Sequence, residues 1–152
     1  MTKKIKLSFP NGFVAYATLR EKEEPECAQG LWDYCEKPER CIVHHTVSTG
    51  NAFQCIKRPV VHPITTGSAA KPIGNKPLWY PDIRAGMVIF RGLTFSLAYG
   101  TSTEPSPASG PWTAQVDPEY LDGYIKACTD VWFHTYIYHK CAVVTIERGE
   151  ES

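Results

Sequence analysis

The stretch KIKLSFPNGFVAYATLR, residues 4–20, decides the fold prediction. Apolar side chains occupy every second position from Ile5 to Phe9, which is the period of a half-buried β-strand. An Asn-Gly pair follows at 11–12, and this pair is the strongest short signal for a β-hairpin turn. Because the run over 13–20 can return as a second strand, we expect the chain to open with an antiparallel hairpin.

Alternating patterns and one continuous apolar run predict the other strands, over residues 40–47, 52–57, 60–64, 87–90, 94–99 and 140–148. Helices are expected over 25–36 and over 118–135, where Asp117 is the expected N-cap. The proline- and glycine-rich segments 58–84 and 100–116 are expected to be long loops. Most strands connect as hairpins. When a sheet of eight such strands closes, no strand is left with unpaired backbone groups at an edge. The predicted fold is mainly β, a closed, largely antiparallel eight-stranded barrel with the two helices over its openings.

Composition and charge narrow the classes of function. A chain of 152 residues with 43% hydrophobic residues suits one folded domain and excludes a disordered protein. The longest apolar run is too short to cross a bilayer and no export signal begins the chain, so we expect a cytoplasmic protein without a membrane partner. Sixteen basic residues balance sixteen acidic ones, which gives nucleic acid no advantage as a partner. Zero net charge and aromatic residues in the long loops favour a homo-oligomer, most simply a dimer.

The cysteines admit two interpretations. An even number in a small chain is typical of a disulfide framework, for which six cysteines allow fifteen pairings. Disulfides need an oxidising compartment, and no Cys-x-x-Cys pair indicates a zinc or redox site. We therefore expect free thiols that pack as small core residues. The six are Cys27, Cys35, Cys41, Cys55, Cys128 and Cys141.

Short motifs spread over most of the chain resemble one known family. In chain order they are Glu24-Pro25-Glu26-Cys27-Ala28 with Trp32, His44-His45 with Ser48 and Gly50, Pro81 with Gly86-Met87-Val88-Ile89-Phe90, Ala98-Tyr99-Gly100, and Val131-Trp132. Together they resemble the bacterial cyclophilin-like barrel proteins, most of which have no assigned function. The resemblance implies a single cyclophilin-like domain over 1–152. It does not reach the true peptidyl-prolyl isomerases, because a Phe-His-Arg strand and a Gln-Gly-Gly motif are missing.

Two adjacent histidines, His44 and His45, are candidate catalytic acids or bases. Neighbouring residues on a strand point to opposite faces, and His45 shares its face with Cys41, Val43 and Val47. This alternation favours His45 as the pocket residue, whereas the family resemblance favours His44. Both histidines therefore stay catalytic candidates. The alternative is one exposed histidine and one hydrogen-bonded core histidine.

The expected strand end at Tyr99 opens a segment rich in hydroxyl groups, where we single out Ser102 as a ligand-binding candidate together with Tyr99. Glu104 is the third catalytic candidate, because it is the only acidic residue between Asp82 and Asp117. A capped, solvated turn is the alternative interpretation of this segment.

Aromatic and basic residues of the long loops complete the candidate site. Trp79, Tyr80 and Trp112 either line a pocket or pack the loops against the barrel. Arg91 flanks these loops and can bind a carboxylate of a ligand.

The predicted function is a small-molecule pocket enzyme with general acid/base chemistry, acting as a hydrolase, isomerase or lyase on a small polar carbonyl or cyclic amide metabolite. The alternatives are a non-catalytic metabolite-binding or scaffold protein, and a peptidyl-prolyl isomerase. No cofactor is expected, and no metal either, because the spacing of His134 and His139 differs from that of a helical zinc pair. The site is expected where the histidine strand, the 99–104 segment and the aromatic loops converge, while the helices carry only apolar stripes.

Overall fold

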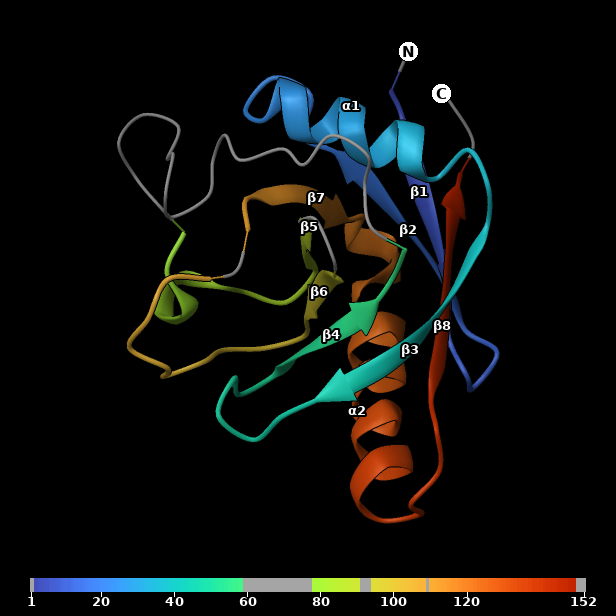
Figure 1. Cartoon of the computed structure of the whole chain (residues 1–152), viewed down its shortest axis with the longest axis vertical. Helices are drawn as coiled ribbons and strands as arrows, with labels where there is room; N and C mark the ends of the chain where they lie inside the picture. The colour runs from blue at the N-terminus through green and yellow to red at the C-terminus, as the bar shows by residue number, and fades with distance from the viewer. Residues whose placement is uncertain (1, 59–77, 91–93, 109, 150–152) are drawn as a thin grey trace.

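The computed structural model describes residues 2–58, 78–90, 94–108 and 110–149 (Figure 1). In this part of the chain eight strands form a closed barrel in the order β1-β2-β7-β5-β6-β4-β3-β8, and every neighbouring pair is antiparallel. The strands are β1 (Lys4–Ser8), β2 (Val14–Leu19), β3 (Glu39–His45), β4 (Ala52–Ile56), β5 (Met87–Phe90), β6 (Thr94–Ala98), β7 (Trp112–Val116) and β8 (Val143–Arg148). The helices are α1 (Pro25–Tyr34) and α2 (Leu121–Tyr136). The predicted mainly β, closed antiparallel barrel with two helices is thus confirmed.

The opening hairpin forms as predicted. β1 and β2 pair from Lys4 opposite Thr18 to Ser8 opposite Val14. Gly12 in the turn has a φ of +88°, in the left-handed region that glycine adopts without steric cost. The alternation of residues 4–20 therefore places one set of side chains in the barrel interior.

One of the eight strands was not predicted. β7 lies at the end of the 100–116 segment that was expected to be a loop, and it joins β2 to β5 through Val116 opposite Ala17 and Gln115 opposite Met87. Three of its five side chains are buried, including the neighbours Thr113 and Ala114, so its sequence has no clear polar–apolar alternation. The predicted strand over 60–64 lies outside the described residues.

Two predicted boundaries also change. β3 ends at His45, so Val47 is not part of the strand and its side chain is 74% exposed in the turn that leads to β4. Asp117 stands before a 3₁₀ helix over Pro118–Tyr120, but its side chain does not cap it. The Asp117 carboxylate instead accepts hydrogen bonds from Lys4 Nζ at 2.7 Å and from Thr18 Oγ1 at 2.5 Å.

The barrel interior and both helices share one hydrophobic cluster. Leu31 of α1 and Val131 of α2 are both fully buried in it, together with inward side chains of the strands. A second, smaller cluster contains Tyr80, Ile83 and Met87. Five of the six cysteines are buried and Cys141 is exposed. The predicted reduced state of the thiols stays a prediction.

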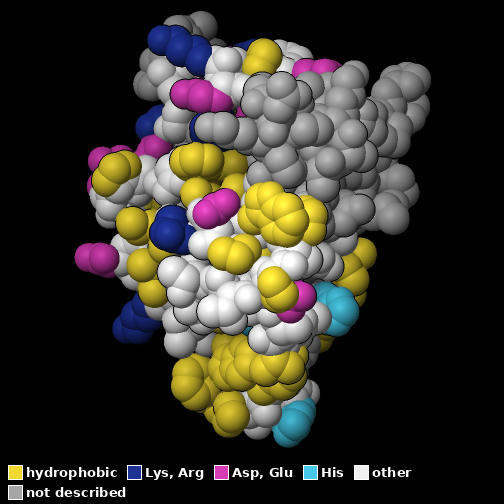
Figure 2. Space-filling model, turned by 90° about the vertical axis from the view of Figure 1, so that its left-hand side faces the viewer, with side chains coloured by type: hydrophobic (Ala, Val, Ile, Leu, Met, Phe, Trp, Pro, Cys, Tyr) yellow, Lys and Arg dark blue, Asp and Glu magenta, His cyan; other side chains and the backbone are white. Residues whose placement is uncertain are grey.

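The surface carries one conspicuous hydrophobic area. Figure 2 shows hydrophobic side chains gathered at the lower end of the molecule, where Figure 1 places the C-terminal end of α2. Exposed large side chains of this region are Phe133, Tyr136, Ile137 and Tyr138. Neither helix within the described ranges has the length and apolar character that a membrane crossing requires.

Candidate functional site

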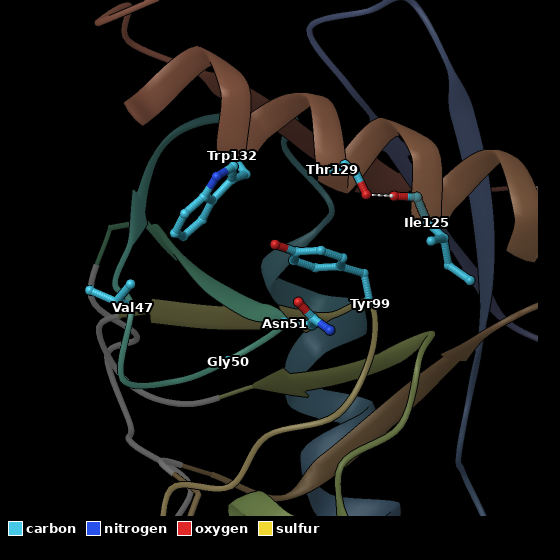
Figure 3. A pocket seen from close by; sticks show the side chains of 7 residues that line it. All are labelled: Val47, Gly50, Asn51, Tyr99, Ile125, Thr129 and Trp132. Atoms are coloured by element: carbon cyan, nitrogen blue, oxygen red, sulfur yellow. Dashed lines mark hydrogen bonds between the residues drawn. The ribbon is translucent and has the colours of Figure 1, made fainter. Parts of the chain in front are cut away.

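A cavity of about 420 Å³ opens between α2 and the turn that joins β3 to β4 (Figure 3). We call it the α2 cavity. Its volume lies in the range of about 300–1,000 Å³ that is typical of small-molecule pockets. None of the described side chains that line it is charged. The lining residues are Val47, Gly50, Asn51, Tyr99, Ile125, Thr129 and Trp132.

Backbone hydrogen bonds join the β3–β4 turn to the segment that follows β6, beside this cavity. Tyr99 N donates to the Asn51 carbonyl oxygen at 2.7 Å, and Asn51 N donates to Thr101 O at 3.1 Å. Gly50 has a φ of +67°, and a Cβ atom there would lie 2.7 Å from Thr101 O. A Cβ atom on Gly100 would collide with the Asn51 side chain. The two glycines therefore allow the close approach that positions Asn51 and Tyr99.

Tyr99 lines the cavity and is hydrogen-bonded to the buried His45, which lies behind it and is not itself a lining residue. His45 is 2% exposed, its Nε2 lies 2.8 Å from the Tyr99 hydroxyl oxygen, and its Nδ1 lies 2.7 Å from Thr46 O. Burial lowers the pKa of His45, which keeps the imidazole neutral at neutral pH. Burial also raises the pKa of Tyr99 to about 12, so its hydroxyl stays protonated. Both groups are thus uncharged hydrogen-bonding partners at rest.

Helix α2 holds His45 in place with two aromatic side chains. The Trp132 ring centre lies 4.9 Å from that of His45, nearly at right angles to it. Trp132 also packs on Tyr136 at 4.3 Å, and the Tyr136 hydroxyl donates to the His45 backbone carbonyl oxygen. Helix α2 thus borders the cavity with residues that the sequence analysis placed only in a helical stripe. The sequence signal was the spacing of Thr129, Trp132 and Tyr136, which puts these side chains on one helix face.

His44 faces a different and smaller space. Its side chain is exposed on the opposite side of β3, where a cavity of about 40 Å³ is lined by His44, Gln54, Tyr80 and Ser96 among others. The strand register sets His44 opposite Gln54, and Gln54 opposite Ser96. The structure thus brings His45 together with Tyr99, which lines the α2 cavity, and His44 together with Tyr80 at the smaller cavity.

Four other predicted site residues line neither cavity: Trp79, Ser102, Glu104 and Trp112. The Ser102 hydroxyl is buried and accepts a hydrogen bond from Glu104 N at 3.2 Å, and the Glu104 side chain is half-buried. Trp79 is 42% exposed. Trp112, the first residue of β7, packs against the side chain of Arg20. Arg91 lies outside the described residues. The roles of these residues stay predictions.

Among the described residues, no group of three or more His, Cys, Asp or Glu side chains is placed to hold a metal ion.

Comparisons with known proteins add one structural likeness. No protein-family model matches the chain, and no curated protein matches it. Among solved structures, "Structure of McbB in complex with tryptophan" matches with a TM-score of 0.76 and 20% sequence identity, over 97% of this chain and 45% of the McbB chain. The chain thus spans less than half the length of that structure. At this identity the likeness shows the barrel fold alone, and the resemblance to cyclophilin-like barrel proteins stays a prediction.

Proposed function

We propose that the α2 cavity binds a small molecule, with Trp132 against its apolar part and Tyr99, hydrogen-bonded to His45 behind it, at its polar end. The observation that carries this proposal is the buried hydrogen bond between Tyr99 and His45 at the wall of a cavity of ligand size. Polar groups are costly to bury, and a pocket typically holds a few of them among apolar side chains to orient a ligand. The barrel likeness to McbB, which was solved with tryptophan bound, supports a small-molecule site in this fold.

The same pair can move a proton, which is the basis of the proposed enzymatic activity. As a bound carbonyl compound or cyclic amide gives up a proton, the Tyr99 oxygen accepts it while the Tyr99 hydroxyl proton passes to His45 Nε2. The imidazolium that forms keeps its Nδ1–H on the Thr46 carbonyl oxygen. The low pKa of His45 makes the return of the proton favourable. The reaction class that fits is a proton transfer at a small carbonyl compound or cyclic amide.

Non-catalytic binding is the second candidate. It is favoured by the raised pKa of Tyr99 and the lowered pKa of His45, because both oppose formation of charge in the cavity. Turnover separates the two functions: Tyr99→Phe reduces it by about 100-fold if the pair transfers a proton. Glu104→Gln and His44→Gln test the two other predicted catalytic residues in the same assay. Full activity of both variants would show that neither residue is catalytic.

Binding itself is tested by calorimetry with a panel of small aromatic and cyclic amide compounds that includes tryptophan and indole. We expect Trp132→Ala to weaken binding by at least about tenfold, because the ring that contacts the ligand is lost. Trp79→Ala is the matched control, since Trp79 is an exposed tryptophan that does not line the cavity. Equal affinity of the two variants would place the ligand elsewhere.

A further inference from the structure

We propose that the α2 cavity selects uncharged, planar ligands that carry a ring N–H, because Tyr99 presents to it a hydrogen-bond acceptor and no donor. This inference rests on the proposed function, in which the cavity binds a small molecule. It adds the direction of the hydrogen bond between the protein and its ligand.

The Thr46 carbonyl determines which imidazole nitrogen of His45 carries the proton. A carbonyl oxygen can only accept a hydrogen bond, and it lies 2.7 Å from Nδ1. Nδ1 is therefore the protonated nitrogen of the neutral ring, and Nε2 keeps its lone pair. The Tyr136 hydroxyl, bonded to the His45 backbone carbonyl, and the Trp132 ring hold the histidine in this orientation.

This tautomer in turn fixes the Tyr99 hydroxyl. Nε2 can only accept, so the single Tyr99 proton is donated to it across 2.8 Å. The Tyr99 oxygen keeps acceptor capacity and has no proton left to offer a ligand. Figure 3 shows the hydroxyl end of Tyr99 directed toward Trp132, within the space below α2.

The Thr129 hydroxyl, which also lines the cavity, does not offer the ligand a hydrogen-bond donor either. Thr129 Oγ1 donates to the Ile125 carbonyl oxygen at 2.8 Å within the helix, as the dashed line in Figure 3 shows. Its proton is therefore also used inside the protein. A ligand atom that bonds the Tyr99 oxygen therefore has to supply the N–H itself, while the Asn51 amide and the Trp132 indole are the N–H donors among the described lining side chains.

The remaining lining selects shape and charge. Trp132, Val47 and Ile125 offer apolar surface, which suits a flat ring. Because none of the seven lining side chains is charged, a charged group that entered the cavity would lose hydration without gaining an ion pair. An uncharged ring with an N–H group satisfies both the apolar surface and the Tyr99 acceptor.

Indole and benzofuran test the inference as a matched pair, because the two rings have nearly the same shape and only indole has an N–H. We expect calorimetry to show benzofuran binding about tenfold more weakly than indole, the effect of one lost hydrogen bond. Equal affinities would overturn this inference and leave the proposed function intact. Binding of neither compound, nor of any other in the panel, would overturn the proposed function and this inference with it.

Two variants test whether the preference for indole over benzofuran comes from Tyr99. In Tyr99→Phe the acceptor is gone, and indole and benzofuran should bind equally. Thr129→Val is the control of similar size, and it should keep the preference because the Thr129 hydroxyl is bonded to its own helix. A preference for indole that survives Tyr99→Phe would overturn the inference.

The tautomer can be measured without a ligand, so the test does not depend on the folding of any variant. Nitrogen-15 NMR of the imidazole in the unaltered protein should show Nδ1 of His45 protonated and Nε2 unprotonated at neutral pH. The opposite tautomer would make Tyr99 the acceptor from His45 and the donor to the cavity, which overturns the inference.

Discussion

The guanidinium carbon of Arg20 lies 3.6 Å from the ring centre of Trp112. Arg20 Nη1 also donates to the Trp112 carbonyl oxygen at 2.8 Å, and Trp112 Nε1 donates to Ala114 O at 3.0 Å. These contacts tie the end of β2 to the start of β7. Trp112 thus packs in the barrel wall, which agrees with the packing alternative stated for it, and its role in ligand binding stays a prediction.

We expect Arg20→Ala to lower the free energy of unfolding by about 1–2 kcal/mol, because both the ring contact and the hydrogen bond are lost. Ligand affinity of the α2 cavity should not change. Urea unfolding monitored by circular dichroism measures the effect, with Lys22→Ala as the control at an exposed position nearby. Equal stability of the two variants would show that the Arg20–Trp112 contact contributes nothing.

Stability should depend on pH through His45. Burial lowers the pKa of this residue in the folded protein, whereas the unfolded chain has the ordinary value of about 6.5. As the pH falls below about 6.5, the unfolded chain binds a proton more readily than the folded protein does, so the free energy of unfolding decreases. The contribution is fully present above this pH and is lost on acidification.

Unfolding curves between about pH 8 and pH 5 measure this dependence. His45→Gln should flatten the decrease below about pH 6.5, while His44→Gln, at an exposed position on the other face of β3, should keep it. Identical pH profiles of the two variants would contradict the assignment to His45.

Thiol titration should find one reactive cysteine in the folded protein and six after denaturation without reductant. Cys141 is exposed and reacts at once, whereas the other five thiols are buried. Burial raises the pKa of Cys41 to about 11, which further slows its reaction as a thiolate. Fewer than four free thiols after denaturation would contradict a reduced protein.

Self-association remains a prediction from the sequence. Light scattering at micromolar concentration should give twice the mass of one 17.0 kDa chain if the protein is a dimer. A mass near that of a single chain would refute it.

The fold was predictable wherever one face of a strand is buried and the other is not. The hairpin of residues 4–20 has this pattern, and its register follows from it. β7 was not predicted because both of its faces are buried, so its sequence does not alternate between polar and apolar residues. Thr113 and Ala114 are adjacent and both fully buried. Glycine and proline at 110–111 directly before it also resemble a loop.

Two residues of the candidate site, His45 and Tyr99, were predictable for the same reason. Alternation along β3 favoured His45 as the inward histidine, although His44 was retained beside it, and the strand end indicated Tyr99. Trp132 was missed as a site residue because a helix stripe does not show which part of it meets the core and which part borders a cavity. Only the tertiary packing of α2 against the turn after β3 makes that distinction.

The pairing of β1 with β8 joins segments from opposite ends of the sequence, with Ile5 beside Arg148. Contacts of such high separation form late and slow the folding of β proteins. During synthesis the ring cannot close until residues 143–148 have left the ribosome. Until then β1 and β3, the two strands that β8 bridges, are open sheet edges that can pair with other chains. A chain that stalls before residue 143 therefore leaves both of these sheet edges unpaired.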